Sequence, residues 1–242
     1  QLGGHALFLS RDDIQLGNGE TIGDTAQVLS RYVDGIMIRT FAHDIVEELA
    51  EHATIPIING LTDDYHPCQV LADLMTIYEQ KKKFAGLRLG FVGDGNNMAH
   101  SLMIGGALLG MDVTIASPES YVVKDDIYQI AQEKAAQSGA KIELITDPNE
   151  AVKDADIIYT DVWTSMGFEA EEKERIQHFV PYQVNETLVS QAKDDYIFMH
   201  CLPAKRGEEV TNDVIDGPNS VVFDEAENRL HAQKAILAAF MS

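Results

Sequence analysis

The sequence predicts an α/β protein made of two subdomains, each with a parallel sheet and helices on both faces. Short apolar runs alternate along the chain with longer stretches in which apolar residues recur every three or four positions, and this alternation is typical of parallel α/β folds. The chain has 242 residues, enough for two domains with a sizeable core. Its 45% hydrophobic and 24% charged residues are an ordinary globular composition, which argues against a disordered chain.

Each predicted strand is a short apolar run bounded by turn-forming or polar residues. In chain order these runs are Ala6–Leu9, Gly35–Arg39, Ile55–Ile58, Leu87–Val92, Asp112–Ala116, Lys141–Ile145, Asp156–Thr160, Tyr196–Met199 and Val221–Phe223.

Each predicted helix is a longer stretch with a period of 3.6 residues between two such runs. Pro67 suits the first turn of its helix, where a missing N–H costs nothing. The helices are expected near Thr21–Tyr32, Asp44–His52, Pro67–Gln80, Met98–Leu109, Asp125–Gln137, Glu169–Phe179, Asn185–Ala192 and Glu225–Met241.

A basic, polar break at residues 81–86 separates a long helix from a fresh strand and is a candidate hinge. We therefore expect a first domain at 1–80 and a second at 81–219, followed by a C-terminal helix at 220–242. The alternative is a solvated loop inside one domain.

The charge balance is strongly acidic, with 18 Lys and Arg against 39 Asp and Glu, a net charge of −21. Such a surface repels phosphate backbones and anionic membranes, so nucleic acid and lipid are poor partner candidates. Two cysteines make no disulfide framework, and we expect a reducing, cytoplasmic location. We find neither a secretory signal nor an apolar run of about 18 residues that would span a membrane.

Polar side chains follow several predicted strands at the point where each strand ends. Ligands of parallel α/β proteins bind at these carboxyl ends, so we expect one rim to carry a binding site for a small polar molecule. The segments concerned are Arg39, Asn59 to Gln69, Gly93 to Asn97, Thr160 to Gly167, and His200 to Pro203.

Two other interpretations of these segments are weaker. Gly93 and Gly95 suggest a dinucleotide loop, but the third glycine position holds Met98 and the next strand ends in Ala116 and Ser117 without an acid for the ribose. A zinc site from His66, Cys68, His200 and Cys201 lacks any usual ligand spacing. Adjacent His200 and Cys201 point to opposite faces of a strand end, which argues against a thiol–imidazole pair.

The motifs resemble those of the aspartate/ornithine carbamoyltransferase family over the whole length from Gln1 to Met241. The matching pieces are His66-Pro67-Cys68-Gln69, Phe91-Val92-Gly93-Asp94-Gly95-Asn96-Asn97, Asp161-Val162-Trp163-Thr164-Ser165-Met166-Gly167, His200-Cys201-Leu202-Pro203 and Glu227-Asn228-Arg229. The Ser-Met-Gly and His-Cys-Leu-Pro elements together favour ornithine as the acceptor. The resemblance implies transfer of the carbamoyl group from carbamoyl phosphate to the side-chain amine of L-ornithine, giving L-citrulline and phosphate in arginine metabolism, with no cofactor or metal.

The resemblance also assigns the carbamoyl phosphate side of the site. It makes the 1–80 domain the carbamoyl phosphate domain, and it implies that the C-terminal helix carries Arg229 to this side. Cationic and N–H donors there would stabilise the negative charge that builds on the carbonyl oxygen. The residues implied are Gln15, Arg39, His66, Pro67, Cys68, Gln69, Cys201, Leu202 and Arg229. Gln15 matches a position that reaches a neighbouring subunit, which implies a homotrimer.

On the acceptor side the resemblance implies that Asn97, Asp161, Ser165 and Met166 bind ornithine in the 81–219 domain. A carboxylate such as Asp161 suits the α-ammonium group. Cys201 matches the residue beside the reacting amine, which must lose a proton before it attacks. The catalytic residues implied are Cys201, Asp161, Arg39 and His66, and we expect a cis peptide bond at Leu202–Pro203.

Two departures from the family pattern bear on activity. The family's Ser-x-Arg-Thr-Arg phosphate motif is absent from the printed sequence, and Lys205 stands where the family has His. We expect a truncated chain; the alternative is a natural short paralogue that binds another molecule. The rival functions are a carbamoyltransferase for another amine, such as putrescine, and a non-catalytic fragment that forms oligomers.

Overall fold

The computed structural model describes residues 1–10, 19–164 and 169–241, and it divides into two compact units. The first unit contains Gln1–Cys68 and Leu230–Ser242, and the second contains Gln69–Arg229. The end of the C-terminal helix therefore belongs to the same unit as the start of the chain. The units divide within a helix, at 68/69, whereas the predicted domain boundary lies after that helix, at 80/81.

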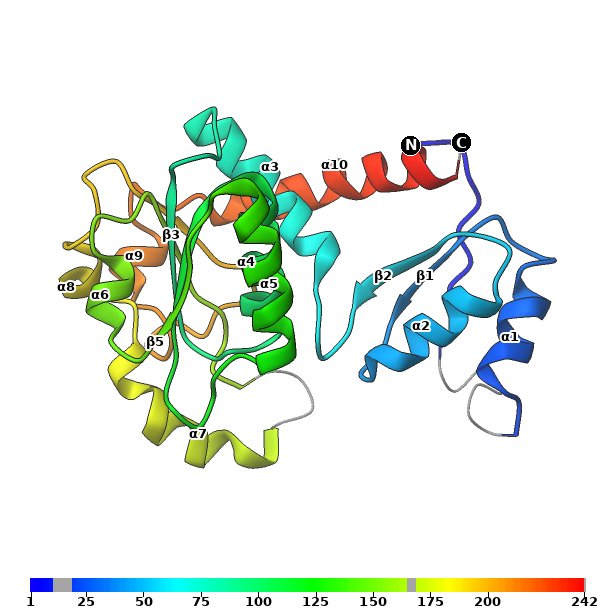
Figure 1. The fold of residues 1–242 in the computed structure, drawn as a ribbon, viewed down its shortest axis with the longest axis horizontal. Helices are drawn as coiled ribbons and strands as arrows, with labels where there is room; N and C mark the ends of the chain where they lie inside the picture. The colour runs from blue at the N-terminus through cyan, green and yellow to red at the C-terminus, as the bar shows by residue number, and fades with distance from the viewer. Residues whose placement is uncertain (11–18, 165–168, 242) are drawn as a thin grey trace. The chain divides into compact units, whose positions relative to one another are not determined.

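The first unit holds a pair of parallel strands with a helix before each (Figure 1). Its complete elements are α1 (Ile22–Leu29), β1 (Ile36–Arg39), α2 (His43–His52) and β2 (Ile57–Leu61). Thr21 caps α1 by accepting a hydrogen bond from the Asp24 N–H, as expected of a threonine at this position. Strands β1 and β2 pair from Ile36 opposite Ile57, and their register shifts between Ile38 and Arg39.

Two predicted strands are wrong. Residues 6–9 form no strand: Phe8 is 90% exposed, and an apolar run without a backbone partner has no sheet to join. Val221–Phe223 is not a strand because the last helix, α10 (Val222–Phe240), has already begun there. The chain beside it makes only an isolated bridge from Ser220 to Phe198, and acidic residues in the first turn of α10 favour the helix.

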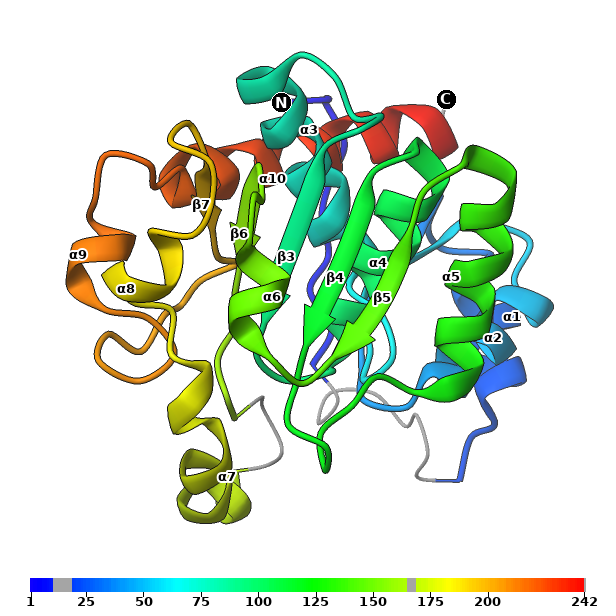
Figure 2. The ribbon, with the colours of Figure 1, turned by 60° about the vertical axis from the view of Figure 1, so that its left-hand side comes forward.

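The second unit is built on a five-stranded, wholly parallel sheet in the order β5-β4-β3-β6-β7, seen side by side in Figure 2. The parallel α/β fold predicted from the sequence is therefore confirmed. The strands are β3 (Arg88–Val92), β4 (Asp112–Ala116), β5 (Ile142–Ile145), β6 (Ile157–Tyr159) and β7 (Ile197–Met199).

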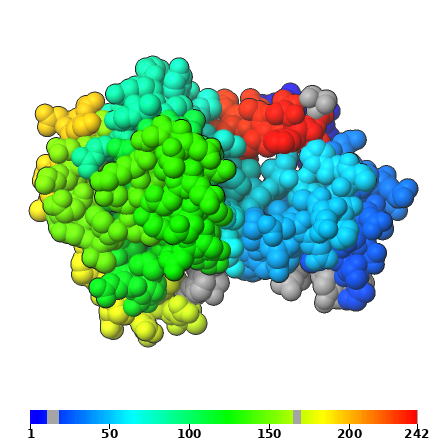
Figure 3. All heavy atoms as spheres, viewed as in Figure 1, coloured from blue at the N-terminus to red at the C-terminus, as the bar shows by residue number. Residues whose placement is uncertain are grey.

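Helices cover both faces of this sheet. In Figure 1, α4 (Asn97–Leu109) and α5 (Asp125–Ser138) lie on one side, with α6 (Pro148–Val152), α8 (Glu186–Val189) and α9 (Asn212–Ile215) on the other. Figure 3 shows the atoms of α4 and α5, in green, covering the first side. The chain also forms α3 (Pro67–Lys81), α7 (Glu172–Phe179) and two 3₁₀ turns at Glu169–Glu171 and Val180–Tyr182. The short helices α6 and α9 have too few residues to show a period, and sequence reasoning missed them.

The sheet is buried on both faces, as an all-parallel sheet requires. Leu89, Phe91 and Val92 of β3 are at most 1% exposed. Between them, Gly90 lets α6 approach closely, because a Cβ there would lie 2.4 Å from the Ala151 carbonyl oxygen. This packing fixes the carboxyl ends of the strands in place.

The strand order places a topological switch point between β3 and β6. The chain leaves β3 toward β4 on one side and later adds β6 on the other side, and ligands of such sheets bind where the order reverses. Within the described residues, no helix is both long and apolar enough to cross a membrane.

Candidate active site

The predicted site residues that the structure describes fall into two groups, one in each compact unit. Arg39, His66, Pro67 and Cys68 belong to the first unit. Gln69, Asn97, Asp161, Cys201, Leu202 and Arg229 belong to the second. Gln15, Ser165 and Met166 lie outside the described residues.

In the first unit, a hydrogen-bonded turn places His66 at the start of α3. Thr62 and Tyr65 exchange backbone and side-chain hydrogen bonds of 2.8 and 3.1 Å, and the His43 ring also contacts both residues. The turn is therefore fixed before any ligand arrives. His66 follows it with only 6% of its surface exposed, and Pro67 occupies the first helical position, as predicted.

Arg39 and Cys68 serve this group differently. Arg39 is the last residue of β1 and is exposed, which leaves its guanidinium available to an anion. Cys68 is buried, and its thiol donates a hydrogen bond of 3.2 Å to the Asn59 carbonyl oxygen in β2. The Cys68 side chain thus joins α3 to β2.

In the second unit, the loop after β3 is shaped by its glycines. A Cβ on Gly95 would lie 2.4 Å from backbone atoms of both Val122 and Val123, so only glycine fits there. Asn96 then caps α4, accepting hydrogen bonds from the Met98 and Ala99 N–H groups. Gly95 therefore allows the loop after β3 to pack closely against the backbone at Val122 and Val123.

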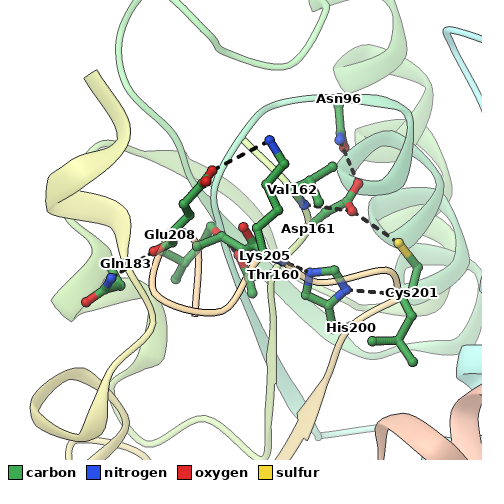
Figure 4. A network of polar contacts seen from close by, with 12 residues as sticks. Asn96, Thr160, Asp161, Val162, Gln183, His200, Cys201, Lys205 and Glu208 are labelled. Carbon is green, nitrogen blue, oxygen red and sulfur yellow. Dashed lines mark hydrogen bonds and ion pairs between the residues drawn. The ribbon is translucent and has the colours of Figure 1, made fainter. Parts of the chain in front are cut away.

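Asp161, just after β6, is the centre of the polar network in this unit (Figure 4). One carboxylate oxygen accepts from the Asn96 amide at 2.9 Å. The other accepts from the Val162 N–H at 2.8 Å and from the Cys201 thiol at 3.1 Å. Sequence reasoning did not select Asn96, and its helix-cap position between a strand and α4 is the signal that would have found it. The prediction that its neighbour Asn97 binds ornithine stays a prediction.

The Cys201 thiol is held in its neutral, protonated form. Burial raises its pKa well above the usual value, and the negative charge of Asp161 raises it further. A protonated thiol is a hydrogen-bond donor, which agrees with its contact to the carboxylate.

His200 shapes the turn that carries Cys201. Its Nδ1 accepts from the Leu202 N–H at 2.9 Å, so the ring proton lies on Nε2, which donates to Glu209 at 3.3 Å. His200 is fully buried and serves the turn, while the Cys201 thiol bonds to Asp161 and not to the ring. The Leu202–Pro203 peptide bond is cis, as predicted.

Beyond this turn lies a pocket of about 500 Å³ whose lining includes Cys201, Leu202, Arg206 and Arg229. The Arg229 Nε is buried and has no hydrogen-bond partner among the described residues. The same holds for Gln69 Oε1. A polar ligand could form the missing hydrogen bonds to this donor and this acceptor, both of which belong to predicted site residues.

A buried ion pair joins the loop after β3 to helix α7. Arg175 bonds to the Asp94 carboxylate and donates from Nε to the Trp163 carbonyl oxygen at 2.7 Å, while its guanidinium lies over the Tyr121 ring. Burial raises the pKa of Asp94 to about 6, against the lowering effect of Arg175. Sequence reasoning missed this pair because the partners are 81 positions apart.

Among residues 1–10, 19–164 and 169–241, one group of side chains could ligate a metal ion, but its ligand atoms already form hydrogen bonds. Ligand atoms of Asp161, His200 and Cys201 lie within 4.8 Å of one another. The His200 Nδ1 accepts a hydrogen bond from the Leu202 N–H, and its Nε2 donates one to Glu209. The Cys201 thiol donates one to Asp161. The group therefore differs from the zinc set weighed from the sequence, and it is satisfied as it stands.

Fold and site together define a class: an α/β enzyme that binds small polar substrates at the carboxyl ends of parallel strands. Two family models cover most of the chain: aspartate/ornithine carbamoyltransferase, carbamoyl-P binding domain, at residues 1–79, and the Asp/Orn binding domain of the same family, at residues 85–240. The chain belongs to the aspartate/ornithine carbamoyltransferase family.

Curated relatives and solved structures agree with this. The chain is 64% identical to the ornithine carbamoyltransferase of Bacillus subtilis over 241 residues, which is 100% of this chain and 76% of the relative. It is 62% identical to "Ornithine carbamoyltransferase, anabolic" of Pyrococcus furiosus, covering 99% of this chain and 76% of the relative. The solved ornithine carbamoyltransferase of that organism superposes with a TM-score of 0.96, covering 99% of this chain and 77% of the solved one. The anabolic enzyme from Campylobacter jejuni, 43% identical, gives 0.93 and covers 99% and 79%.

Proposed function

We propose that this protein is an ornithine carbamoyltransferase, which transfers the carbamoyl group of carbamoyl phosphate to the side-chain amine of L-ornithine. The products are L-citrulline and phosphate. The match of both domain models, one for each substrate, carries this proposal. Relatives above 60% identity that are named for the same reaction support it.

On the donor side, Arg39, His66, Gln69 and Arg229 are the proposed carbamoyl phosphate contacts. The exposed guanidinium of Arg39 and the unsatisfied Nε of Arg229 suit phosphate oxygens, which arginine binds through paired N–H groups. Positive and N–H donors also stabilise the oxyanion that forms when the amine attacks the carbonyl carbon. Gln15, Pro67, Cys68 and Leu202 complete the proposed set.

On the acceptor side, the contact between Asp161 and Cys201 supports a proposed role for both residues at the amine end of the chemistry. The attacking amine must lose a proton. A neutral thiol whose proton already points to a carboxylate is a poor base, and Asp161 is the acceptor of the pair. We therefore propose that the proton leaves toward Asp161, with Cys201 as the neighbour that orients the carboxylate. Asn97, Ser165 and Met166 are proposed to bind the amino-acid end of ornithine.

The rival functions weighed from the sequence are not favoured. The relatives are named for ornithine and not for another amine such as putrescine, and the chain matches both substrate domains, as an enzyme does and a non-catalytic fragment need not. A relative named "anabolic" at 62% identity supports a role in arginine biosynthesis. We further propose a homotrimer in the cytoplasm, to be tested by light scattering after gel filtration and by cell fractionation.

A citrulline assay on the purified protein tests the proposal. Its intact mass is measured first, and carbamoyl phosphate is then supplied with L-ornithine, putrescine or L-aspartate. We expect product from ornithine alone. Asp161→Asn removes both the proposed proton acceptor and a charge-assisted contact to ornithine, so kcat should fall and the KM for ornithine should rise by roughly 10–100-fold, while the KM for carbamoyl phosphate changes much less. Equal use of putrescine, or equal losses for both substrates, would contradict the assignment.

A further inference from the structure

A second polar cluster lies buried in the second unit, and apart from Gln69 its members have no part in the reaction described above. Gln69 and Asp73 of α3, Tyr159 of β6 and Glu225 of α10 are each 0% exposed. The Gln69 amide donates to Asp73 at 2.8 Å and to Glu225 at 3.3 Å. The Tyr159 hydroxyl lies 3.3 Å from Asp73 Oδ2 and 3.0 Å from Glu225 Oε1. Two carboxyl groups thus share one tyrosine and one amide.

The hydrogen count shows that this cluster needs an extra proton. The single Tyr159 hydrogen can serve only one of the two carboxyl oxygens that face it, and the Tyr159 oxygen is then free to accept. Two ionised carboxylates that face the same hydroxyl and amide groups in a fully buried site repel each other strongly. A proton on one carboxyl satisfies the remaining oxygen pair and removes the repulsion.

The surrounding charged side chains do not offset the repulsion between the two carboxylates. Within the described residues, neither Asp73 nor Glu225 forms an ion pair; Arg229 is the cation whose charge acts on Asp73. Asp161 and Cys201 face the cluster through Tyr159, and Asp161 brings further negative charge. Burial raises the pKa of Asp73 to about 7 and that of Glu225 well above its usual value, so the pair keeps a proton at neutral pH.

The pair also decides which way the Gln69 amide points. Both amide hydrogens are taken by the carboxyl oxygens, and a flipped amide would set oxygen against oxygen. Gln69 Oε1 is therefore left facing away from the pair, buried and with no partner in the described part of the chain. A buried carbonyl oxygen without a hydrogen-bond partner can accept a hydrogen bond from an N–H group of a ligand.

Glu225 also forms a hydrogen bond to the loop that carries Cys201. Its second oxygen accepts from the His200 N–H at 2.9 Å, at the end of β7. One buried carboxyl therefore connects the orientation of Gln69 with the turn His200-Cys201-Leu202.

We infer that Asp73 and Glu225 form a carboxyl pair sharing one proton, and that this pair is a positioning element that holds Gln69 Oε1 ready to accept a hydrogen bond from the amide nitrogen of the carbamoyl group. This inference rests on the proposed function. It explains how the protein would distinguish carbamoyl phosphate from an acyl phosphate that lacks the nitrogen: the analogue leaves Gln69 Oε1 buried and unpaired.

The shared proton is tested by infrared spectroscopy at pH 8, where ordinary carboxyls and Asp94 are ionised. The wild-type protein is expected to show the C=O stretching band of a protonated carboxylic acid. Asp73→Asn supplies a neutral hydrogen-bond donor in place of the protonated acid, so the band should vanish. Asp156→Asn, a buried acid outside the cluster that binds the Arg88 N–H and Lys193, is the control and should keep it. A wild-type spectrum without the band overturns the inference.

The positioning role is tested by comparing the KM for carbamoyl phosphate with the inhibition constant of acetyl phosphate, which carries a methyl group in place of the amide. Asp73→Ala frees the Gln69 amide to turn, and we expect the preference for carbamoyl phosphate to fall about tenfold. Asp73→Asn offers an oxygen to Gln69 and should restore the preference, while Asp156→Asn should leave it unchanged. Circular dichroism confirms that each variant is folded.

The two proposals fail in different ways. If the wild-type protein makes no citrulline, the proposed function is wrong, while the infrared band still reports on the pair. If citrulline forms but the band is absent, or if Asp73→Ala folds and keeps the full preference for carbamoyl phosphate, the inference is wrong and the function stands. If Asp73→Ala does not fold, loss of the preference in Asp73→Asn contradicts the inference in its place.

Discussion

The thiol of Cys201 donates its hydrogen bond to Asp161, and the two atoms lie 3.1 Å apart. The resemblance implies that Cys201 lies beside the reacting amine and that Asp161 binds the α-ammonium group of ornithine, and the structure brings these two side chains into direct contact. A thiol that donates a hydrogen bond to an ionised carboxylate keeps its proton, so it is neither a nucleophile nor a base. The proposed base is therefore Asp161, and the reactivity of the Cys201 thiol can be used to measure the effect of the Asp161 charge.

Alkylation by iodoacetamide should be slow at Cys201 near neutral pH and faster in Asp161→Asn. Burial and the Asp161 charge both raise the thiol pKa, so removing the charge lowers the pKa and increases the thiolate fraction. The labelling rate of the Cys201 peptide is followed by mass spectrometry between pH 7 and 9, with the buried Cys68 as an internal reference. An unchanged rate in the variant would mean that Asp161 does not control the thiol.

Arg175→Met should destabilise the second unit strongly. It leaves the Asp94 carboxylate buried without its ion-pair partner, a change that typically costs about 3–5 kcal/mol. The unfolding free energy is measured by urea titration at pH 7. The double variant Arg175→Met with Asp94→Asn removes the stranded charge and should recover part of the loss; a double variant no more stable than the single one would argue against this origin of the effect.

The raised pKa of Asp94 should make the unfolding free energy depend on pH in a specific way. Asp94 has a folded-state pKa of about 6 against 3.8 for an ordinary aspartate, so the unfolded chain releases the proton first as the pH rises. Its contribution to the unfolding free energy should fall between about pH 4 and pH 6 and stay level above that range. Asp94→Asn should remove this component, which is read as the difference between the two urea-derived profiles. Parallel profiles would show that the carboxyl titrates normally.

Gly95→Ala should destabilise the loop after β3. The added methyl would lie 2.4 Å from backbone atoms of Val122 and Val123, and backbone cannot move aside as a side chain can. Overpacking of this kind costs about 1–3 kcal/mol. Gly4→Ala is the matched control, because a Cβ at Gly4 meets nothing within 4 Å, and it should change stability by less than about 0.5 kcal/mol. Thermal unfolding of both variants decides the point.

The regular part of the fold could be predicted from the sequence because it depends on local patterns. The run Asp112–Ala116 and the helix start at Pro67 agree with the structure to the residue, since a buried parallel strand and a proline in the first turn leave clear signals. Ala6–Leu9 has the same apolar pattern as a strand but pairs with no strand in the described part of the chain, and pairing is not a local property.

By itself, the sequence determined the fold class, the family and the strand ends at which chemistry-bearing residues gather, because each depends on periodicity or on short motifs. Only the tertiary structure decided which of those residues touch. Asn96 contacts Asp161, the Cys201 thiol donates a hydrogen bond to Asp161, and Gln69 contacts Glu225 across 156 positions of chain. Those contacts also set the protonation states of the site, because burial and charge act through space while a sequence orders residues only along the chain.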